Sequence, residues 1–556
     1  MYLNMGMLHI SNPMHCQERF TALPSFAAAA ASTRLEKQAD SNKRTPSRIA
    51  FCIPPTNHSR LKKHEKRGLL HWTKPDYAAA TRPRLFHVDV EPLTEARFFH
   101  STSLSAKWRD IQGAENWDGL LDPIDPDLRQ ELIRYGEFAQ VCYDAFDFEK
   151  HSKYCGSCKY NRRKVLEKVG LKYAADYEVT KYLYSTSDIN LPDFFHRSDN
   201  KKETWSRDSN WMGFVAISTS ASEIQRLGRR DIVVAWRGTV TSPEWICNLE
   251  DWLSPSALGP AHQTVQAFGS AKIERGFRSI YTSKKQTSRY NRESAQEQLL
   301  SEIRRLLKEY QGDDLSITVT GHSLGGALAL LSAYDIAESA INTSRSHQKP
   351  LQQRCSFKEH CTIDRSFIRD LNRWGDAASE NVPITVFTFA GPRVGNDAFR
   401  DRCEELGIKT LRVVNEKDIV PKVPGLVLNE HMHHLRSWID KLPWTYSHVG
   451  VELALNTQDS TYLKGTGFFD LASHHNLEAY LHLLDGYRST QQRFCSFDDH
   501  RDLTLVNKFS DLLKPEYCIP PYWWQEENKG LQKNAKGIWV RRDREEEHIP
   551  IVYRDA

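Results

Sequence analysis

The segment Gly321-His-Ser-Leu-Gly325 constrains the fold of this chain more than any other feature. An apolar strand pattern at 315–320 runs directly into it, and a run rich in Ala and Leu at 324–340 follows. This is the context of a nucleophile elbow, a tight strand-to-helix turn that raises a serine hydroxyl above the end of a sheet. A helix starting at Leu324 would direct free N–H groups to this point. We therefore expect Ser323 to be a catalytic nucleophile and the Leu324 N–H to be an oxyanion donor. The alternative is a glycine-rich turn with an incidental serine.

The pattern around the elbow predicts a mainly parallel sheet. Short apolar runs, typical of buried strands, alternate with amphipathic helical stretches. Such alternation favours a sheet whose two faces are covered by helices. The expected strands are 213–218, 231–236, 315–320, 383–389 and 410–414, and the expected helices are 128–145, 299–310 and 324–340.

A serine hydroxyl needs a base to take its proton before it is a useful nucleophile. In elbow folds the acid and then the histidine follow the serine along the chain. Asp418 comes just after the last expected strand and is the candidate acid, with Glu416 as its rival. His475 opens a helical stretch and is the candidate base, preferred over His474. The other histidines weighed are His431, His433, His434 and His448, together with His482, expected to be a packed helix residue, and His322, interpreted as part of the elbow.

A short amphipathic segment is the candidate for a lid. At ~100° per residue its apolar side chains fall within an arc of about 120°. One interpretation is a surface helix that packs one face on the core. The other is a lid that covers the site in water and opens onto lipid, because a lipid surface offsets the cost of exposing the apolar face. The residues of this lid are Trp245, Ile246, Leu249, Trp252 and Leu253.

Four spaced motifs carry a resemblance to a known family. Ala235-Trp-Arg-Gly-Thr239, Gly321-His-Ser-Leu-Gly-Gly326, Phe389-Ala-Gly-Pro-Arg-Val-Gly-Asn396 and Asp418-Ile-Val-Pro421 together resemble the class 3 (fungal-type) triacylglycerol lipase family. Tyr154-Cys-Gly-Ser-Cys158, His475-Asn-Leu-Glu-Ala479 and Pro520-Pro-Tyr-Trp-Trp524 resemble its plant chloroplast phospholipase A1 branch.

The resemblance implies an α/β-hydrolase fold and a Ser323–Asp418–His475 triad. It also implies that Thr239 joins the Leu324 N–H in the oxyanion hole. The expected activity is hydrolysis of the sn-1 ester of phosphatidylcholine at a lipid surface, with galactolipids and triacylglycerol as further substrates and no metal or organic cofactor. Two alternatives stay open: a lipase-like scaffold without catalysis, and an acyltransferase that uses the same triad with an alcohol acceptor.

The N-terminal segment has its own composition. Residues 1–80 hold 12 Lys and Arg against 5 Asp and Glu, whereas the whole chain has a net charge of only +4. We therefore expect residues 1–80 to be a disordered segment similar to an organelle transit peptide, with a disordered tail without a targeting role as the alternative. The resemblance implies that the organelle is the chloroplast. The remainder is slightly acidic, which argues against nucleic acid as a partner because nucleic-acid binding needs a basic face.

The expected organisation is a hydrolase domain at 106–490, with a polar surface insertion at 341–382, and a C-terminal extension at 491–556. No run reaches the ~18 apolar residues of a membrane-spanning helix. Cys155 and Cys158 form the single C-x-x-C. We interpret them as ordinary thiols, since a zinc site needs two further ligands, and Cys355, His360 and Cys361 are not tied to them. A redox-sensitive pair is the other interpretation.

Overall fold

The computed structural model describes residues 103–149, 151–186, 209–239, 255–257, 271–288, 290–343, 381–424, 446–465, 471–495, 501–524 and 531–550. All of them belong to one compact unit, Glu95–Ala556. The expectations for residues 1–80 and for most of the insertion at 341–382 lie outside the described residues. No described helix is both long enough and apolar enough to cross a membrane.

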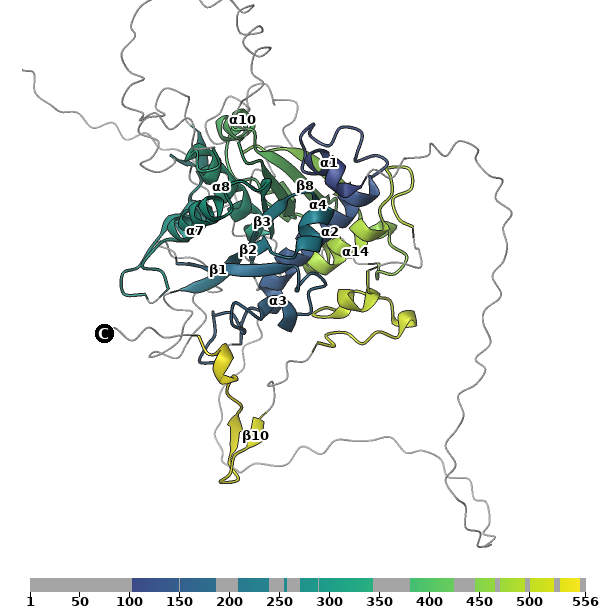
Figure 1. Ribbon diagram of the computed structural model, residues 1–556. Coiled ribbons are helices and arrows are strands. Elements are labelled where there is room, and N and C mark those ends of the chain that lie inside the picture. The colour runs from purple at the N-terminus through teal and green to yellow at the C-terminus, as the bar shows by residue number, and fades with distance from the viewer. Residues whose placement is uncertain are drawn as a thin grey trace, which may run out of the picture. The chain divides into compact units, whose positions relative to one another are not determined.

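A seven-stranded sheet in the order β1-β2-β3-β6-β7-β8-β9 forms the centre of the fold (Figure 1). From β3 to β9 every neighbouring pair is parallel, whereas β1, β2 and β3 pair antiparallel at one side. The mainly parallel α/β-hydrolase sheet expected from the sequence is therefore confirmed. The strands are β1 (Tyr177–Ser185), β2 (Asn210–Ser218), β3 (Arg230–Trp236), β6 (Leu315–His322), β7 (Ile384–Phe389), β8 (Lys409–Asn415) and β9 (Val451–Leu455).

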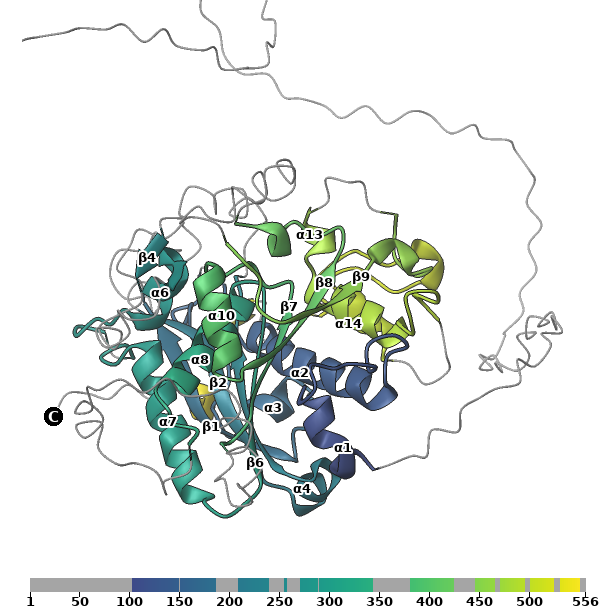
Figure 2. The same ribbon diagram turned by 90° about the horizontal axis from the view of Figure 1, so that it is seen from above.

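Helices cover both faces of this sheet and create two cores (Figure 2). On one face lie α2 (Pro126–Asp144) and α14 (Leu477–Gly486), and on the other lie α6 (Arg275–Thr282), α7 (Ala295–Glu309) and α8 (Leu324–Glu338). Local signals start these helices: Asp125 caps α2, whose first residue is proline, and Ser294 with Glu297 forms a capping box on α7. In contrast, α8 is almost wholly buried and has no capping side chain, because it begins at the elbow itself.

Shorter elements complete the described fold. The helices are α1 (Leu104–Ile111), α3 (Val165–Lys168), α4 (Ala221–Leu227), α10 (Asp397–Glu405) and α13 (Leu471–His474), and the 3₁₀ turns are Val420–Lys422, Thr457–Asp459, Leu503–Asn507, Pro515–Tyr517 and Glu546–His548. Two small antiparallel pairs lie apart from the central sheet: β4 (Pro255–Ala257) with β5 (Lys272–Glu274), and β10 (Leu531–Lys533) with β11 (Trp539–Arg541).

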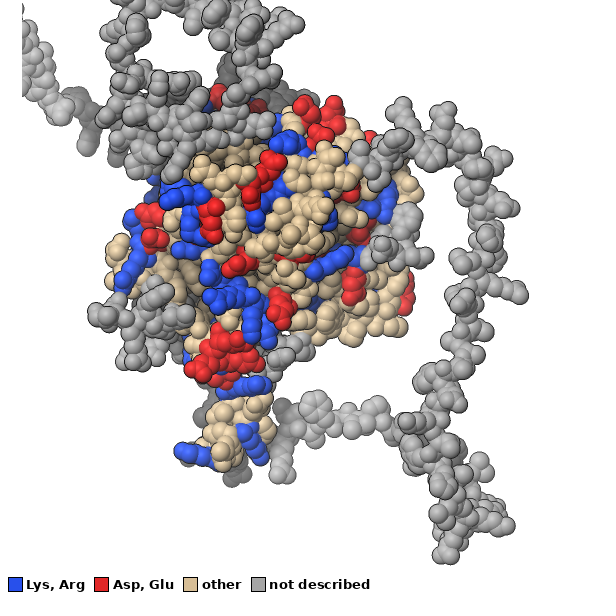
Figure 3. Space-filling model, in the orientation of Figure 1, with Lys and Arg blue, Asp and Glu red and all other residues tan. Residues whose placement is uncertain are grey.

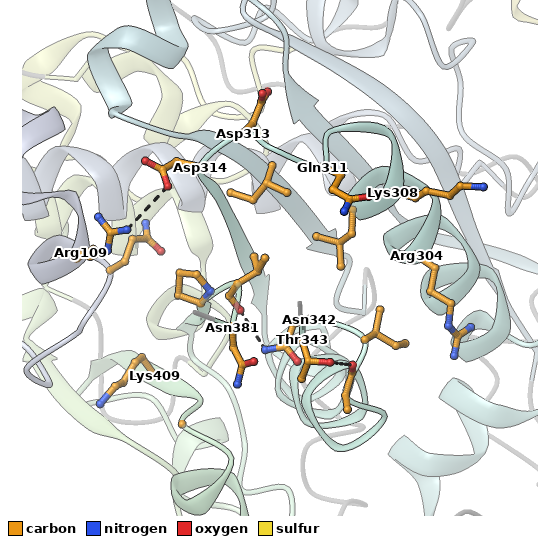
Figure 4. A pocket seen from close by; sticks show the side chains of 18 of the residues that line it. Arg109, Arg304, Lys308, Gln311, Asp313, Asp314, Asn342, Thr343, Asn381 and Lys409 are labelled. Atoms are coloured by element: carbon orange, nitrogen blue, oxygen red, sulfur yellow. Dashed lines mark hydrogen bonds and ion pairs between the residues drawn. The ribbon is translucent and has the colours of Figure 1, made fainter. Parts of the chain in front are cut away.

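Asn342 and Val382, near the two ends of the expected insertion, are joined by a pair of hydrogen bonds. The Asn342 side-chain amide donates to the Val382 carbonyl at 3.0 Å, and the Val382 N–H donates to the Asn342 carbonyl at 2.9 Å. A cavity of about 680 Å³ opens beside this pair at the amino ends of β6, β7 and β8 (Figure 4). Arg109 and Asp314 form an ion pair across it at 4.0 Å. The cavity lies at the opposite end of the sheet from Ser323, and no residue nominated for catalysis lines it.

Gly213 in β2 lies at a close approach between the antiparallel strands β2 and β3. A Cβ at this position would lie 2.0 Å from the carbonyl oxygen of Ala235 in β3, a backbone atom that cannot rotate away. We expect Gly213→Ala to lower the free energy of unfolding by roughly 2–3 kcal/mol through overpacking. Gly465, where a Cβ meets nothing within 4 Å, is the matched control. Gly465→Ala should stay within about 0.5 kcal/mol of the parent in urea unfolding, and equal stability of the two variants would contradict the prediction.

Candidate active site

The elbow places Ser323 in a strained turn between β6 and α8. Ser323 has φ 60° and ψ −128°, a conformation that L-residues rarely adopt. A Cβ on Gly321 would lie 2.2 Å from the Gly325 carbonyl oxygen, and one on Gly325 would lie 2.4 Å from the Trp236 carbonyl oxygen. Only glycine therefore fits on either side of the turn. The Ser323 N–H donates to the Phe389 carbonyl at 2.9 Å, which ties the turn to β7.

Asp418 and His475, which lie 57 residues apart, are in direct contact. The Oδ2 atom of Asp418 lies 2.6 Å from Nδ1 of His475. The carboxylate is 1% exposed and accepts two further hydrogen bonds, one from the Tyr480 hydroxyl at 2.7 Å to Oδ2 and one from the Val420 N–H at 2.9 Å to Oδ1. These contacts hold the carboxylate in one orientation toward His475. An acceptor at Nδ1 fixes the imidazole tautomer that leaves Nε2 able to accept a proton.

The imidazole of His475 lies close to the elbow. Its ring centroid is 4.6 Å from that of His322, the residue just before Ser323. Among the described residues, neither Nε2 of His475 nor the Oγ of Ser323 has a hydrogen-bond partner, although both atoms are buried. The structure thus brings Ser323, His475 and Asp418 into one region with the two reactive atoms uncommitted. Such hydrogen bonds are often long before substrate binds.

Thr239 is positioned by the turn that follows β3. A Cβ on Gly238 would lie 3.1 Å from Cβ of Ser323 and 2.5 Å from the His322 carbonyl oxygen, so this turn packs directly on the elbow. Thr239 is the next residue and is half-buried. Leu324 is the first residue of α8, where amides have no partner within the helix. Both nominated oxyanion donors therefore come from segments that touch Ser323 or adjoin it.

Arg237 fixes the backbone of the turn that precedes Thr239 through hydrogen bonds. Its guanidinium donates to the carbonyls of Trp211 at 3.0 Å and Gly238 at 2.9 Å, and it stacks 3.7 Å from the ring centroid of Phe146. Burial lowers the pKa of Arg237 to about 10. A buried cation that bonds to the carbonyl before Thr239 restricts where Thr239 can lie. The Arg-Gly-Thr motif indicated this turn but not the function of its arginine.

His322 is a buried residue of the elbow that contacts Tyr143. The hydroxyl of Tyr143 lies 2.7 Å from its Nδ1, and the ring is buried. Burial, and then the neighbouring His475, lowers the pKa of His322 well below its ordinary value, so this imidazole is neutral. Tyr143 and Tyr480, which hold His322 and Asp418, were not identified from the sequence. Tyr480 lies five residues after His475, and that spacing gives no signal because side chains on one helix face are three or four residues apart.

The rival residues lie in other surroundings. Glu416 forms an ion pair with Arg493 at 3.1 Å. Three rival histidines are each engaged elsewhere: His474 with the Thr457 hydroxyl at 3.0 Å, His448 with the Pro421 carbonyl at 2.8 Å and His482 with the Ser460 hydroxyl at 2.8 Å. His431, His433 and His434 lie outside the described residues, as do the lid residues Trp245, Ile246, Leu249, Trp252 and Leu253. The lid stays a prediction.

Cys155 and Cys158 of the C-x-x-C are buried and are not joined in a disulfide. The Cys158 thiol donates to the Tyr182 hydroxyl at 3.3 Å, and burial raises the pKa of Cys158 to about 11. Cys355, His360 and Cys361 lie outside the described residues. Within the described part, the group with metal-ligand spacing is Glu545, Glu547 and His548, in the C-terminal extension and not at the elbow.

Comparisons with known proteins agree with these motifs. The family model described as Lipase (class 3) matches residues 233–428. "Phospholipase A1-Igamma2, chloroplastic" from Arabidopsis thaliana is 48% identical over 80% of this chain and 78% of that protein. "Phospholipase A1-Igamma1, chloroplastic" from the same plant is 47% identical over 82% of each chain. "Galactolipase DONGLE, chloroplastic", also from Arabidopsis thaliana, is 39% identical over 74% of this chain and 76% of that protein.

His448 provides a test of the electrostatics around this site. Burial, followed by Arg412 and Arg393, lowers its pKa well below the ordinary value. Below about pH 6.5 the unfolded chain takes up a proton that the folded imidazole does not, so the folded state loses stability as pH falls. His448→Gln keeps a donor for the Pro421 carbonyl and removes the titration. We expect its melting temperature to fall less between pH 7 and pH 5 than that of the parent. Parallel curves would contradict this prediction.

Proposed function

Because the chain belongs to the class 3 lipase family, we propose that it hydrolyses the sn-1 acyl ester of polar glycerolipids, with Ser323 as the nucleophile, His475 as the base and Asp418 as its partner. The single observation that carries this assignment is the 2.6 Å contact between Nδ1 of His475 and Asp418. It leaves Nε2 of His475 without a partner among the described residues, close to a serine hydroxyl in the same state. This is the arrangement that activates a serine.

Acylation follows from these positions. Ser323 Oγ attacks the ester carbonyl carbon while its proton passes to Nε2 of His475. Asp418 stabilises the imidazolium through Nδ1–H, and Tyr480 and Val420 hold the carboxylate in place by donating to it. The negative charge on the carbonyl oxygen is stabilised by the Leu324 N–H at the start of α8 and by Thr239. The imidazolium then gives its proton to the glycerol oxygen, the C–O bond breaks, and a lysolipid leaves.

Deacylation reverses the roles. Water enters beside His475, gives a proton to Nε2 and attacks the acyl carbon. The second tetrahedral intermediate uses the same two oxyanion donors, and its collapse returns the proton to Ser323 and releases the fatty acid. Water as acceptor makes the protein a carboxylic ester hydrolase. An alcohol in the same place would make it an acyltransferase, so acceptor competition is part of the test below.

The substrate class and the location rest on the relatives. Two chloroplastic proteins named phospholipase A1 and one named galactolipase align over about three quarters or more of the chain. They support a phospholipid such as phosphatidylcholine as substrate, with galactolipids as a second headgroup class. They also support a plastid location, in agreement with the basic composition of residues 1–80. A catalytically silent scaffold is disfavoured, since the serine, acid and histidine positions are all occupied.

Ser323→Ala is the direct test. We expect the parent to release labelled fatty acid from phosphatidylcholine or monogalactosyldiacylglycerol labelled at sn-1, and much less from the sn-2 isomers. The variant should lose at least about 10³-fold in kcat, because the nucleophile is gone, with an unchanged circular dichroism spectrum. Parent-like turnover in the variant would refute the assignment. Transfer of label to added glycerol in place of free acid would indicate the acyltransferase.

Tyr480→Phe tests the hydrogen bonds of Asp418. Loss of the hydroxyl removes one donor from the carboxylate and one acceptor from the Asn415 N–H. We expect kcat on a short soluble ester to fall roughly three- to tenfold, as for one lost hydrogen bond of about 0.7–1.4 kcal/mol, with KM unchanged. Tyr487→Phe, another buried tyrosine at the end of α14, is the control and should retain full activity. Equal loss in both variants would indicate a general packing effect.

A further inference from the structure

The C-terminal extension contains a small hairpin whose apolar side chains face solvent. β10 and β11 pair antiparallel, with Leu531 opposite Arg541 and Lys533 opposite Trp539. The exposed fractions are 60% for Leu531, 57% for Ile538, 61% for Trp539 and 38% for Val540. Single exposed apolar residues are ordinary, but several within one hairpin form a patch that normally has a partner.

The hairpin is a formed structure with a defined tip. The Asn534 N–H donates to the Ile538 carbonyl at 2.9 Å, and the Gly537 N–H donates to the Asn534 carbonyl at 2.9 Å. Gly537 has φ 73°, the left-handed conformation that such a turn requires. Opposite residues share a face, so Trp539 and Leu531 lie on the same side as Lys533 and Arg541. That face mixes apolar and cationic side chains.

All charges within the hairpin are positive. Residues 531–542 contain Lys533, Lys536, Arg541 and Arg542 and no Asp or Glu. Lys533 lies 5.2 Å from the Trp539 ring centroid, and Arg541 faces Glu149 at 3.9 Å. Lys536 and Arg542 have no ion-pair partner in the described part of the chain. In Figure 3 the place that β10 occupies in Figure 1 shows tan surface bordered by blue side chains.

Asp543 and Arg544, which follow the hairpin, attach it to the rest of the fold. Asp543 accepts from Lys153 at 2.5 Å and from the Tyr154 hydroxyl at 3.1 Å. Arg544, largely buried, donates to Asp147 at 2.6 Å and to the Cys158 carbonyl at 2.8 Å. Asp543 is therefore paired at the root of the hairpin, next to the C-x-x-C loop, and the cationic apolar part lies beyond it. Glu545, Glu546 and Glu547 follow as exposed acids, of which Glu547 pairs with Lys164 at 2.9 Å.

We propose that the β10–β11 hairpin is a membrane-docking element that inserts Ile538 and Trp539 at the surface of a bilayer containing anionic lipid. Tryptophan favours the boundary between headgroups and acyl chains, and basic side chains favour a negatively charged leaflet. An isolated two-stranded hairpin is marginally stable in water, so a surface that covers its apolar side chains also stabilises it. The inference extends the proposed function, because a glycerolipid hydrolase must meet a lipid surface, but its test needs no turnover.

The experiment measures vesicle binding by the full chain carrying Ser323→Ala, so that lipid is not consumed. The probes are vesicles of phosphatidylcholine alone and of phosphatidylcholine with phosphatidylglycerol, and binding is read by co-sedimentation. Ile538→Ser with Trp539→Ser should weaken binding at least about tenfold to both vesicles, because buried apolar area is lost. Lys533→Gln with Lys536→Gln should weaken binding about thirtyfold to the anionic vesicles only, and high salt should remove that difference.

Matched controls separate this surface from general stickiness. Tyr522→Ser removes an aromatic residue that is 60% exposed elsewhere, and Arg304→Gln with Lys308→Gln removes two cations from α7. Neither control should change binding. When the hairpin changes are made in the chain that keeps Ser323, the variants should hydrolyse a short soluble ester at the parent rate and have the parent melting temperature.

The possible outcomes separate docking from catalysis. Parent-like vesicle binding by both hairpin variants would overturn the proposal and leave a protein partner as the occupant. Equal losses in the controls would also overturn it. If only the hairpin variants lose binding while the Ser323 parent hydrolyses no lipid, the docking element stands and the proposed function fails.

Discussion

Three backbone segments meet around Ser323 at distances that only glycine permits, and the rest of the site depends on this contact. Gly321 and Gly325 lie against each other and against the end of β3, and Gly238 lies against Ser323 itself. The close approach forces the positive φ of Ser323 and places the start of α8 beside the Thr239 turn. Strain of this kind persists only where surrounding packing over-determines it. Here the parallel pairs β3–β6 and β6–β7 provide that packing.

Around this contact the protein buries polar groups in satisfied arrangements. Asp418 has three donors, and Arg237 donates to two carbonyls and a thioether sulfur. An unpaired polar group in the interior costs more free energy than a hydrogen bond contributes to stability. The partners of Asp418 and Arg237 therefore hold each side chain in one geometry. Ser323 Oγ and His475 Nε2 are, like His322 Nε2, buried atoms without a hydrogen-bond partner among the described residues, and the first two are the atoms that the proposed reaction uses.

Periodicity and motif context predicted β2, β3, β6, β7 and β8, because each of them contains a continuous apolar run. The family resemblance is likewise confirmed by the comparisons. Ser323, Asp418 and His475 were nominated because elbow folds arrange them in chain order, and the structure brings them into one region. Tyr480, Tyr143 and Arg237 were not assigned their contacts, since these depend on tertiary approach between distant segments. Neither β1 nor the exposed hairpin was expected as a strand, and the sequence pattern of β2 did not indicate that it pairs antiparallel with β1 and β3.

The paired hydrogen bonds between Asn342 and Val382 affect which insertions the protein tolerates at this junction. When the two ends of a segment are held together, the entropy cost of closing the loop grows only slowly with the length of the segment. The Asn342–Val382 junction lies at the amino ends of the strands, whereas Ser323 lies at their carboxyl ends. Whole modules could therefore be acquired, exchanged or discarded at this junction over evolutionary time while the chemistry remained under separate selection. An engineer could graft a tag or a reporter domain at the same junction.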